Sequence, residues 1–300
     1  MVPAAPGEDA AARGLRASTP AEIPARGWKD ILKRFYQRLD DDRILAIAAG
    51  VTFYALLAIF PAIAALVSIY GLFSDPGTIA KHLDDISGMV PGGAIEVVRG
   101  QLENLTAKGN SALGVAFIIG LAISLWSANS GVKAMMDALN VAYAEREKRG
   151  FFRLNATSLV FTLGGIVAIL VGLGAIVVLP LALQYLGLDR EKWITDAIKW
   201  PVLFVVVGLA LAVLYRYAPS RRDAKWRWIT WGSAVATVGW IAISILFSWY
   251  ATNFGSYNKT YGSLGAVVGF MTWIWLSVTV ILIGAELDAE MERRKLANSE

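Results

Sequence analysis

Two pairs of charged residues border long apolar stretches of the chain. Lys133 and Asp137 stand four residues apart, and Glu286 and Asp288 stand two apart. Charge next to hydrocarbon is costly and often functional. We expect Lys133 and Glu286 to lie at matched depth and to pair, closing one end of a polar cavity. The alternative is that both side chains reach separately to a membrane surface.

Most catalytic chemistry is poorly supported by the residue types present. The chain has no cysteine and a single histidine, His82, so thiolate sites and multi-histidine metal clusters are excluded. Phosphodiester cleavage, for example, needs metal ligands or an acid–base pair near a basic groove, and these residue types supply neither. We therefore expect no enzyme activity, no metal and no cofactor.

Composition places the chain in a membrane. Of its 300 residues, 56% are hydrophobic and 17% are charged, and the mean hydropathy is +0.52. A soluble domain carries about 25% charged residues. The net charge of +4 is spread over short clusters between apolar runs, which favours a topology signal over a nucleic-acid surface.

The apolar runs predict an all-α membrane protein with a six-helix transmembrane bundle, since about 20 apolar residues cross a bilayer. The predicted spans cover residues 44–73, 113–132, 159–186, 200–217, 228–251 and 264–284. Pro61 lies inside the first span and should bend it. We assign residues 28–290 to this transmembrane domain, with cytoplasmic tails at 1–27, which is disordered, and 291–300.

Two amphipathic regions accompany the spans. Between Trp28 and Leu39 the apolar residues recur at helical spacing, and Lys29, Lys33, Arg34 and Arg38 occupy the other face. This pattern predicts a helix lying in the membrane interface and binding anionic headgroups, with packing against the protein as the alternative. Residues 74–110 predict helices over the outer mouth of the bundle, either as a cap or as simple packing.

Basic residues alternate strongly between successive loops. They are dense before the first span, at 146–153, at 216–227 and at 293–295, and sparse in the intervening loops. The positive-inside rule therefore places both termini in the cytoplasm.

Neutral polar residues interrupt several of the spans, and a turn rich in Tyr, Asn and Gly precedes the sixth. Such residues usually support helix packing, with the lining of a polar cavity as the alternative. The candidates for a cavity or its gate are Pro61, Asn129, Lys133, Asp137, Asn253, Tyr257, Asn258, Tyr261 and Glu286.

Several segments resemble the YihY/BrkB family of bacterial inner-membrane proteins. They are NFGSYN at 253–258, TYGSLG at 260–265, GAEL at 284–287, LYRYAP at 214–219, the stretch 140–150 ending in EKRG, and the first span from 43 to 61. The resemblance runs from about residue 28 to the end of the sixth span. It implies a six-helix inner-membrane protein linked to envelope integrity and suspected of transport. Some members carry a ribonuclease label, which the residues here argue against.

Two function classes follow. The first is a transporter or flippase of a small or lipidic solute, with a polar cavity among the first, second, fifth and sixth spans. The second is a membrane scaffold for envelope biogenesis, whose interior should be tightly filled. Membrane lipids are the expected partners. We expect no nucleic-acid partner, and a homo-oligomer is compatible with the sequence but has no support in it.

Overall fold

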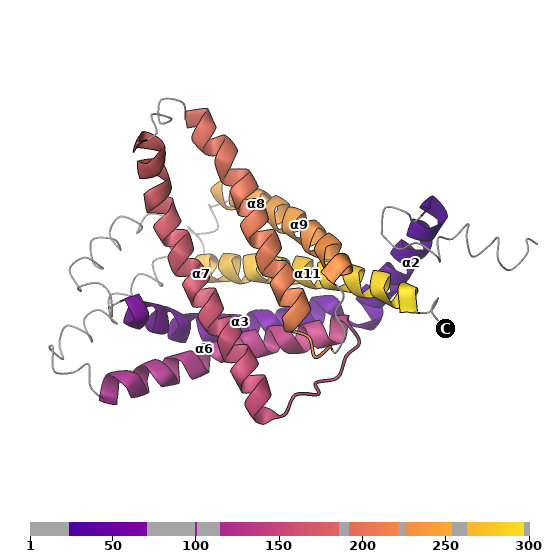
Figure 1. The fold of residues 1–300 in the computed structure, drawn as a ribbon, viewed down its shortest axis with the longest axis horizontal. Coiled ribbons are helices and arrows are strands. Elements are labelled where there is room, and N and C mark those ends of the chain that lie inside the picture. Colours follow the sequence, from indigo (N-terminus) through magenta and orange to yellow (C-terminus); the bar gives the residue numbers. More distant parts are fainter. Residues whose placement is uncertain are drawn as a thin grey trace, which may run out of the picture.

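The computed structural model describes residues 24–70, 100, 115–185, 192–221, 226–253 and 263–296. Regular structure in these ranges is entirely α-helical (Figure 1). The helices are α2 (Ala25–Asp41), α3 (Ile44–Tyr70), α6 (Val115–Ala142), α7 (Phe151–Tyr185), α8 (Lys192–Tyr217), α9 (Trp226–Asn253) and α11 (Ser263–Leu296). The segments predicted to form the N-terminal tail and the outer loop lie largely outside the described residues.

The described part of each predicted span lies on one long helix. Within the described residues, four stretches have the length and hydropathy to cross a membrane: Ile44–Ile63, Phe151–Ala168, Trp231–Tyr250 and Val267–Arg293. A further apolar stretch, Phe204–Tyr217, is shorter. The described part of the chain is thus all-helical with four candidate spans, and the count of six stays a prediction.

The helices pack around α11 and α3. Helix α3 lies along α6, α11 packs on both α9 and α3, and α8 packs on α9 (Figure 1). Helix α7 packs on α6, while α2 contacts the far end of α11 close to the C-terminus. Elements from both halves of the sequence therefore share one core.

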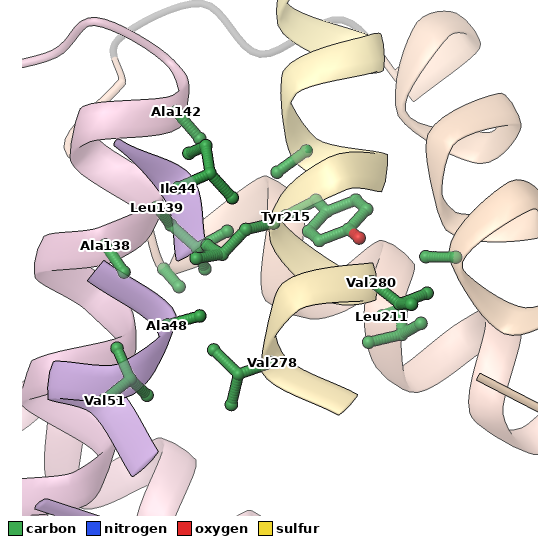
Figure 2. Packing of buried hydrophobic residues seen from close by; sticks show 14 of the residues in the cluster. Ile44, Ala48, Val51, Ala138, Leu139, Ala142, Leu211, Tyr215, Val278 and Val280 are labelled. Carbon is green, nitrogen blue, oxygen red and sulfur yellow. The ribbon is translucent and has the colours of Figure 1, made fainter. Parts of the chain in front are cut away.

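Small and branched side chains build that core. Figure 2 shows Ala48 and Val51 of α3 facing the bundle interior, with Leu139 of α6 and Val278 of α11 nearby. A Cβ on Gly131 of α6 would stand only 3.2–3.3 Å from Ala58 and Ala55 of α3. Small residues let two helix backbones approach closely, which is how helices associate in lipid.

The outward faces are strongly apolar. Ile118 of α6, Val160 of α7 and Leu246 of α9 are 63%, 69% and 63% exposed. Contiguous apolar surface of this kind is rare on a soluble monomer. Hydrocarbon is its natural solvent, so the helices present these faces to lipid.

Helix α2 is present where the amphipathic pattern predicted a helix. Ile31 is fully buried and packs with Leu287 and Met291 of α11, whereas Leu32 and Tyr36 are 54% and 75% exposed. One edge of α2 therefore packs on the protein. Its position in a membrane interface stays a prediction.

Candidate functional site

One end of the bundle gathers most of the buried charge. The end of α6, the end of α8, the start of α9 and the last turns of α11 meet there, together with the α2–α3 turn. We call this region the charged end. Described members of the basic clusters, namely Arg38, Arg149, Arg221 and Arg293, lie at the charged end. The side of the membrane that this end faces stays a prediction.

Helix α11 brings three carboxylates into the charged end. It continues beyond Gly284, where the predicted span ended, and runs to Leu296. Glu286, Asp288 and Glu290 are 0%, 2% and 4% exposed. A buried carboxylate requires a partner or a proton. The three residues meet this requirement in different ways.

Glu286 faces another acid. Its carboxyl group lies within hydrogen-bonding reach of the carboxyl of Asp42, in the turn that joins α2 to α3. Within the described part of the chain, neither Oε1 nor Oε2 of Glu286 receives a bond from a donor, and Oδ2 of Asp42 is also without one. Arg38 approaches Asp42 only to 3.9 Å.

One carboxylate oxygen of Asp288 bonds to the neighbouring helix α9. Its Oδ1 accepts a hydrogen bond of 2.7 Å from the backbone N–H of Gly232 in α9. The approach requires glycine, because a Cβ at Gly232 would lie 2.4 Å from both the Asp288 carboxyl carbon and the carbonyl oxygen of Gly284. Asp288 therefore fixes α11 against α9.

Glu290 lies between two arginines. Arg34 of α2 approaches its Oε1 to 3.3 Å, and Arg293 approaches its Oε2 to 3.8 Å. Arg293 also donates to the carbonyl of Ala142 at the end of α6. Glu290 thus joins α2 to α11 by charge, and Arg293 joins α11 to the end of α6.

Arg221 closes the charged end from the side of α8. It donates to Glu292 and to the carbonyl of Tyr215, both at 2.6 Å. Its guanidinium carbon lies 3.9 Å from the centre of the Tyr143 ring, a cation–π contact. Burial raises the pKa of the Tyr143 phenol well above its ordinary value, and the charge of Asp288 adds to this.

The loop between α6 and α7 is tied to the end of α8. Arg149 forms a bidentate pair with Glu147, with both bonds at 2.7 Å, and donates to the carbonyl of Ala218. Asn140 donates to Glu147 and accepts from the N–H of Ser220. The Arg149 bonds lower the pKa of Glu147 to about 2. We call this set the loop clamp.

A line of polar contacts runs between α6 and α7. Lys133 donates to Asn155 at 2.5 Å and its ammonium lies 4.8 Å from the centre of the Trp126 ring. One turn before Lys133 on α6, the fully buried Asn129 accepts a hydrogen bond of 3.1 Å at its Oδ1 from Thr162 of α7. The Nδ2 of Asn129 has no partner.

The expected ion pair between Lys133 and Glu286 is wrong. Lys133 points to α7, and Glu286 points to the α2–α3 turn. Depth along a helix follows from sequence position, but the direction in which a side chain leaves the helix axis depends on how neighbouring helices are rotated. Matched depth was therefore insufficient to define the contact.

The remaining sequence candidates do not converge on one place. Pro61 lies inside α3, which continues to Tyr70, and its side chain is half-buried. Asp137 is exposed on α6, and Asn253 is the last residue of α9. Tyr257, Asn258 and Tyr261 lie outside the described residues.

Sequence reasoning missed Asp42, Tyr143 and Arg221 as members of a site. A signal for them existed in the segments that carry the family resemblance: Tyr143 lies within 140–150, Arg221 lies two residues after 214–219, and Asp42 directly precedes 43–61. Their convergence in space is a property of the fold. Within the described residues, no group of three or more His, Cys, Asp or Glu side chains is placed to hold a metal ion.

Comparison with known proteins agrees with these segments. The family described as Virulence factor BrkB matches residues 35–300. A ribonuclease-like protein of Bacillus subtilis, YfkH, is 30% identical over 274 residues, covering 88% of this chain and 96% of YfkH. The UPF0761 membrane protein IL2447 of Idiomarina loihiensis is 26% identical over 90% of this chain and 93% of its own length.

A third relative is longer than this chain. The UPF0761 membrane protein Mpe_A1422 of Methylibium petroleiphilum is 25% identical over 87% of this chain, but the match spans only 62% of that protein. No solved structure matches the fold. The apolar helices, the buried charged end and the match over residues 35–300 together show that the chain is a membrane protein of the BrkB family.

Proposed function

We propose that this chain moves a small or lipidic solute across the bacterial inner membrane and thereby supports envelope integrity. The observation that carries the proposal is the carboxylate of Glu286, which is fully buried in the helix bundle and has no donor among the residues that the structure describes. A group of this kind destabilises a membrane bundle, and intramembrane ionisable residues generally mark substrate or ion pathways.

Further polar atoms without partners support the same proposal. The Nδ2 of Asn129 on α6 and the Oγ1 of Thr279 on α11 are buried and unsatisfied. In contrast, Trp240 donates to Ser277 and Trp273 donates to Ser244 across the α9–α11 contact. Buried polar atoms are normally paired, so unpaired ones are the natural places for a polar solute or water to bind.

We propose that the charged end faces the cytoplasm, together with both termini. The density of Lys and Arg in the loops that meet there supports this orientation. Because the chain has no cysteine, single-cysteine variants test it directly. A membrane-impermeant maleimide applied to intact cells should label Ser256→Cys and leave Arg146→Cys unlabelled; the reverse pattern would invert the topology.

The proposed function does not include nuclease activity. The ribonuclease-like name belongs to YfkH. In this chain, one histidine and no cysteine leave few groups for phosphodiester chemistry.

A scaffold function is the second candidate, favoured by the close crossing of α9 and α11. A Cβ at Gly284 would lie 2.6–2.7 Å from the Tyr215 hydroxyl, from Ala236 and from the carbonyl of Gly232. A bundle packed this tightly at one level resembles a rigid framework more than a moving carrier.

Reconstitution separates the two candidates. The purified protein is placed in liposomes, and scrambling of fluorescent phospholipids and uptake of labelled polar solutes are measured. Under the transport proposal, Asn129→Leu and Thr279→Val should each reduce the rate by about tenfold or more. The matched control is Thr272→Val, an exposed threonine on the same helix as Thr279, which should retain the rate.

The opposite result has a defined meaning. If neither lipid nor solute crosses, and if Asn129→Leu raises the melting temperature, the polar atoms serve no transport role. The scaffold function then stands in place of the transporter.

A further inference from the structure

Asp42 and Glu286 are two neighbouring acids, and both carboxyl oxygens of Glu286 and Oδ2 of Asp42 lack hydrogen-bond donors among the described residues. Both are acceptors when ionised, and the two carboxyl groups are in hydrogen-bonding contact. Glu286 is fully buried. Two facing carboxylates repel each other strongly in a low-dielectric interior, unless a proton or a cation is held between them.

The neighbouring arginines do not supply a cation between the two carboxylates. From α2, Arg38 reaches Asp42 only at 3.9 Å, and Arg34 is directed to Glu290. From α11, Arg293 is directed to Glu290 and to the carbonyl of Ala142.

The remaining ionisable neighbours also have other contacts. Arg221 binds Glu292 and stacks on Tyr143, while Asp288 binds the N–H of Gly232. Tyr143 contributes a hydroxyl without a partner. Among the described residues, Arg34, Arg221 and Arg293 are thus engaged elsewhere and Arg38 is held at a distance, while Arg43, directly after Asp42, is exposed.

We propose that Asp42 and Glu286 share a single proton and form a proton-binding site at the charged end of the bundle. In the bound state one carboxyl donates an O–H···O⁻ bond to the other carboxylate. On release, the proton passes to water and leaves two carboxylates. Within the described residues no third acidic ligand completes a metal site, which favours a proton over a divalent cation.

The site lies where proton release can move helices. Asp42 precedes the first residue of α3, and Glu286 is on α11. Three residues after Asp42, the carbonyl of Leu45 in α3 accepts a hydrogen bond of 3.0 Å from Trp275 of α11, which lies eleven residues before Glu286. Repulsion between the two carboxylates acts directly on this α3–α11 contact, so protonation closes the contact and release loosens it.

Any coupling between this proton and solute movement depends on the proposed transport function. Proton binding by Asp42 and Glu286 does not depend on it. Binding is therefore tested on the purified protein without any transport assay. Infrared difference spectra between pH about 5 and about 9 should contain the carbonyl stretch of one protonated carboxylic acid, which Glu286→Gln and Asp42→Asn each abolish.

Thermal unfolding supplies the second measurement. The melting temperature of the unmodified protein should fall by about 3–6 °C as the pH rises across that range, because the folded state holds a proton that the unfolded chain releases. In Glu286→Gln the side-chain amide donates to Asp42 in place of the proton, so its melting temperature should stay within about 1 °C. Asp42→Asn should behave in the same way.

Glu290→Gln is the matched control. Glu290 is as buried as Glu286 on the same helix but is paired with arginines, so this variant should keep both the infrared band and the pH slope. An unchanged band and an unchanged slope in Glu286→Gln would overturn the proposal. A melting temperature that rises with sodium concentration at fixed pH and ionic strength would also overturn it, by showing that a metal cation occupies the pair.

Discussion

Two glutamates at the same end of the molecule have opposite environments. Glu147, in the loop clamp, accepts three side-chain hydrogen bonds and pairs with Arg149. Glu286, in the bundle, accepts none and faces Asp42. Glu147 is held in its ionised form, which stabilises the fold. The packing around Glu286 offers no such stabilisation.

This difference separates a structural carboxylate from a candidate working one. The loop clamp joins the α6–α7 loop to the end of α8 through charge-assisted bonds, which are the strong class of hydrogen bond. Stability would be served equally well or better by an apolar residue at position 286. The following changes test the contrast, starting with the largest expected effect.

Arg149→Ala should destabilise the protein by about 3 kcal/mol, because Glu147 loses two of its three side-chain hydrogen bonds and the carbonyl of Ala218 loses its Arg149 donor. The free energy of unfolding in detergent measures this. Arg146→Ala, an exposed arginine in the same loop, should have almost no effect. Equal losses in the two variants would show that the clamp adds nothing beyond loop charge.

Gly232→Ala should destabilise by about 2 kcal/mol, since the new Cβ has to displace Asp288 and the backbone of α11. Thermal unfolding detects the loss. The control is Gly164→Ala on α7, where a Cβ meets open space and alanine favours the helix by up to about 1 kcal/mol. A stable Gly232→Ala variant would mean that Asp288 is not fixed against α9.

Acidification should act on the loop clamp. The pKa of Glu147 is lowered to about 2 from an ordinary value of 4.5, mainly by the Arg149 hydrogen bond. Its contribution to stability is therefore complete above pH 4.5 and is lost as the pH falls toward 2. The melting temperature of the unmodified protein should decline over this range more steeply than that of Glu147→Gln. Parallel curves would contradict the assignment.

Glu286→Gln should have the smallest effect, a change in the free energy of unfolding below about 1 kcal/mol near neutral pH. The amide replaces a carboxyl that already shares a proton, so little is lost. The corresponding change at the loop clamp, Glu147→Gln, should cost more, since it breaks a bidentate ion pair. If Glu286→Gln were the more damaging of the two, the contrast between these glutamates would fail.

Much of the architecture could be predicted from residue patterns. The described part of every predicted span lies on a long helix, and Arg149, Arg221 and Arg293 from the basic loops and tail lie at one end. Both features depend on one-dimensional properties, namely apolar length and the spacing of charge. The partner of Glu286 could not be predicted in this way, since it required the rotation of α11 relative to α3.

The sequence by itself determined that this chain forms long apolar helices and that Glu286 stands close to one end of the last helix. Tertiary structure alone decided that Glu286 faces Asp42, that Lys133 faces Asn155, and that Gly232 accommodates Asp288. The physical reason is that hydrophobicity acts through local composition, whereas a polar contact depends on the close approach and rotation of helices that are distant in sequence.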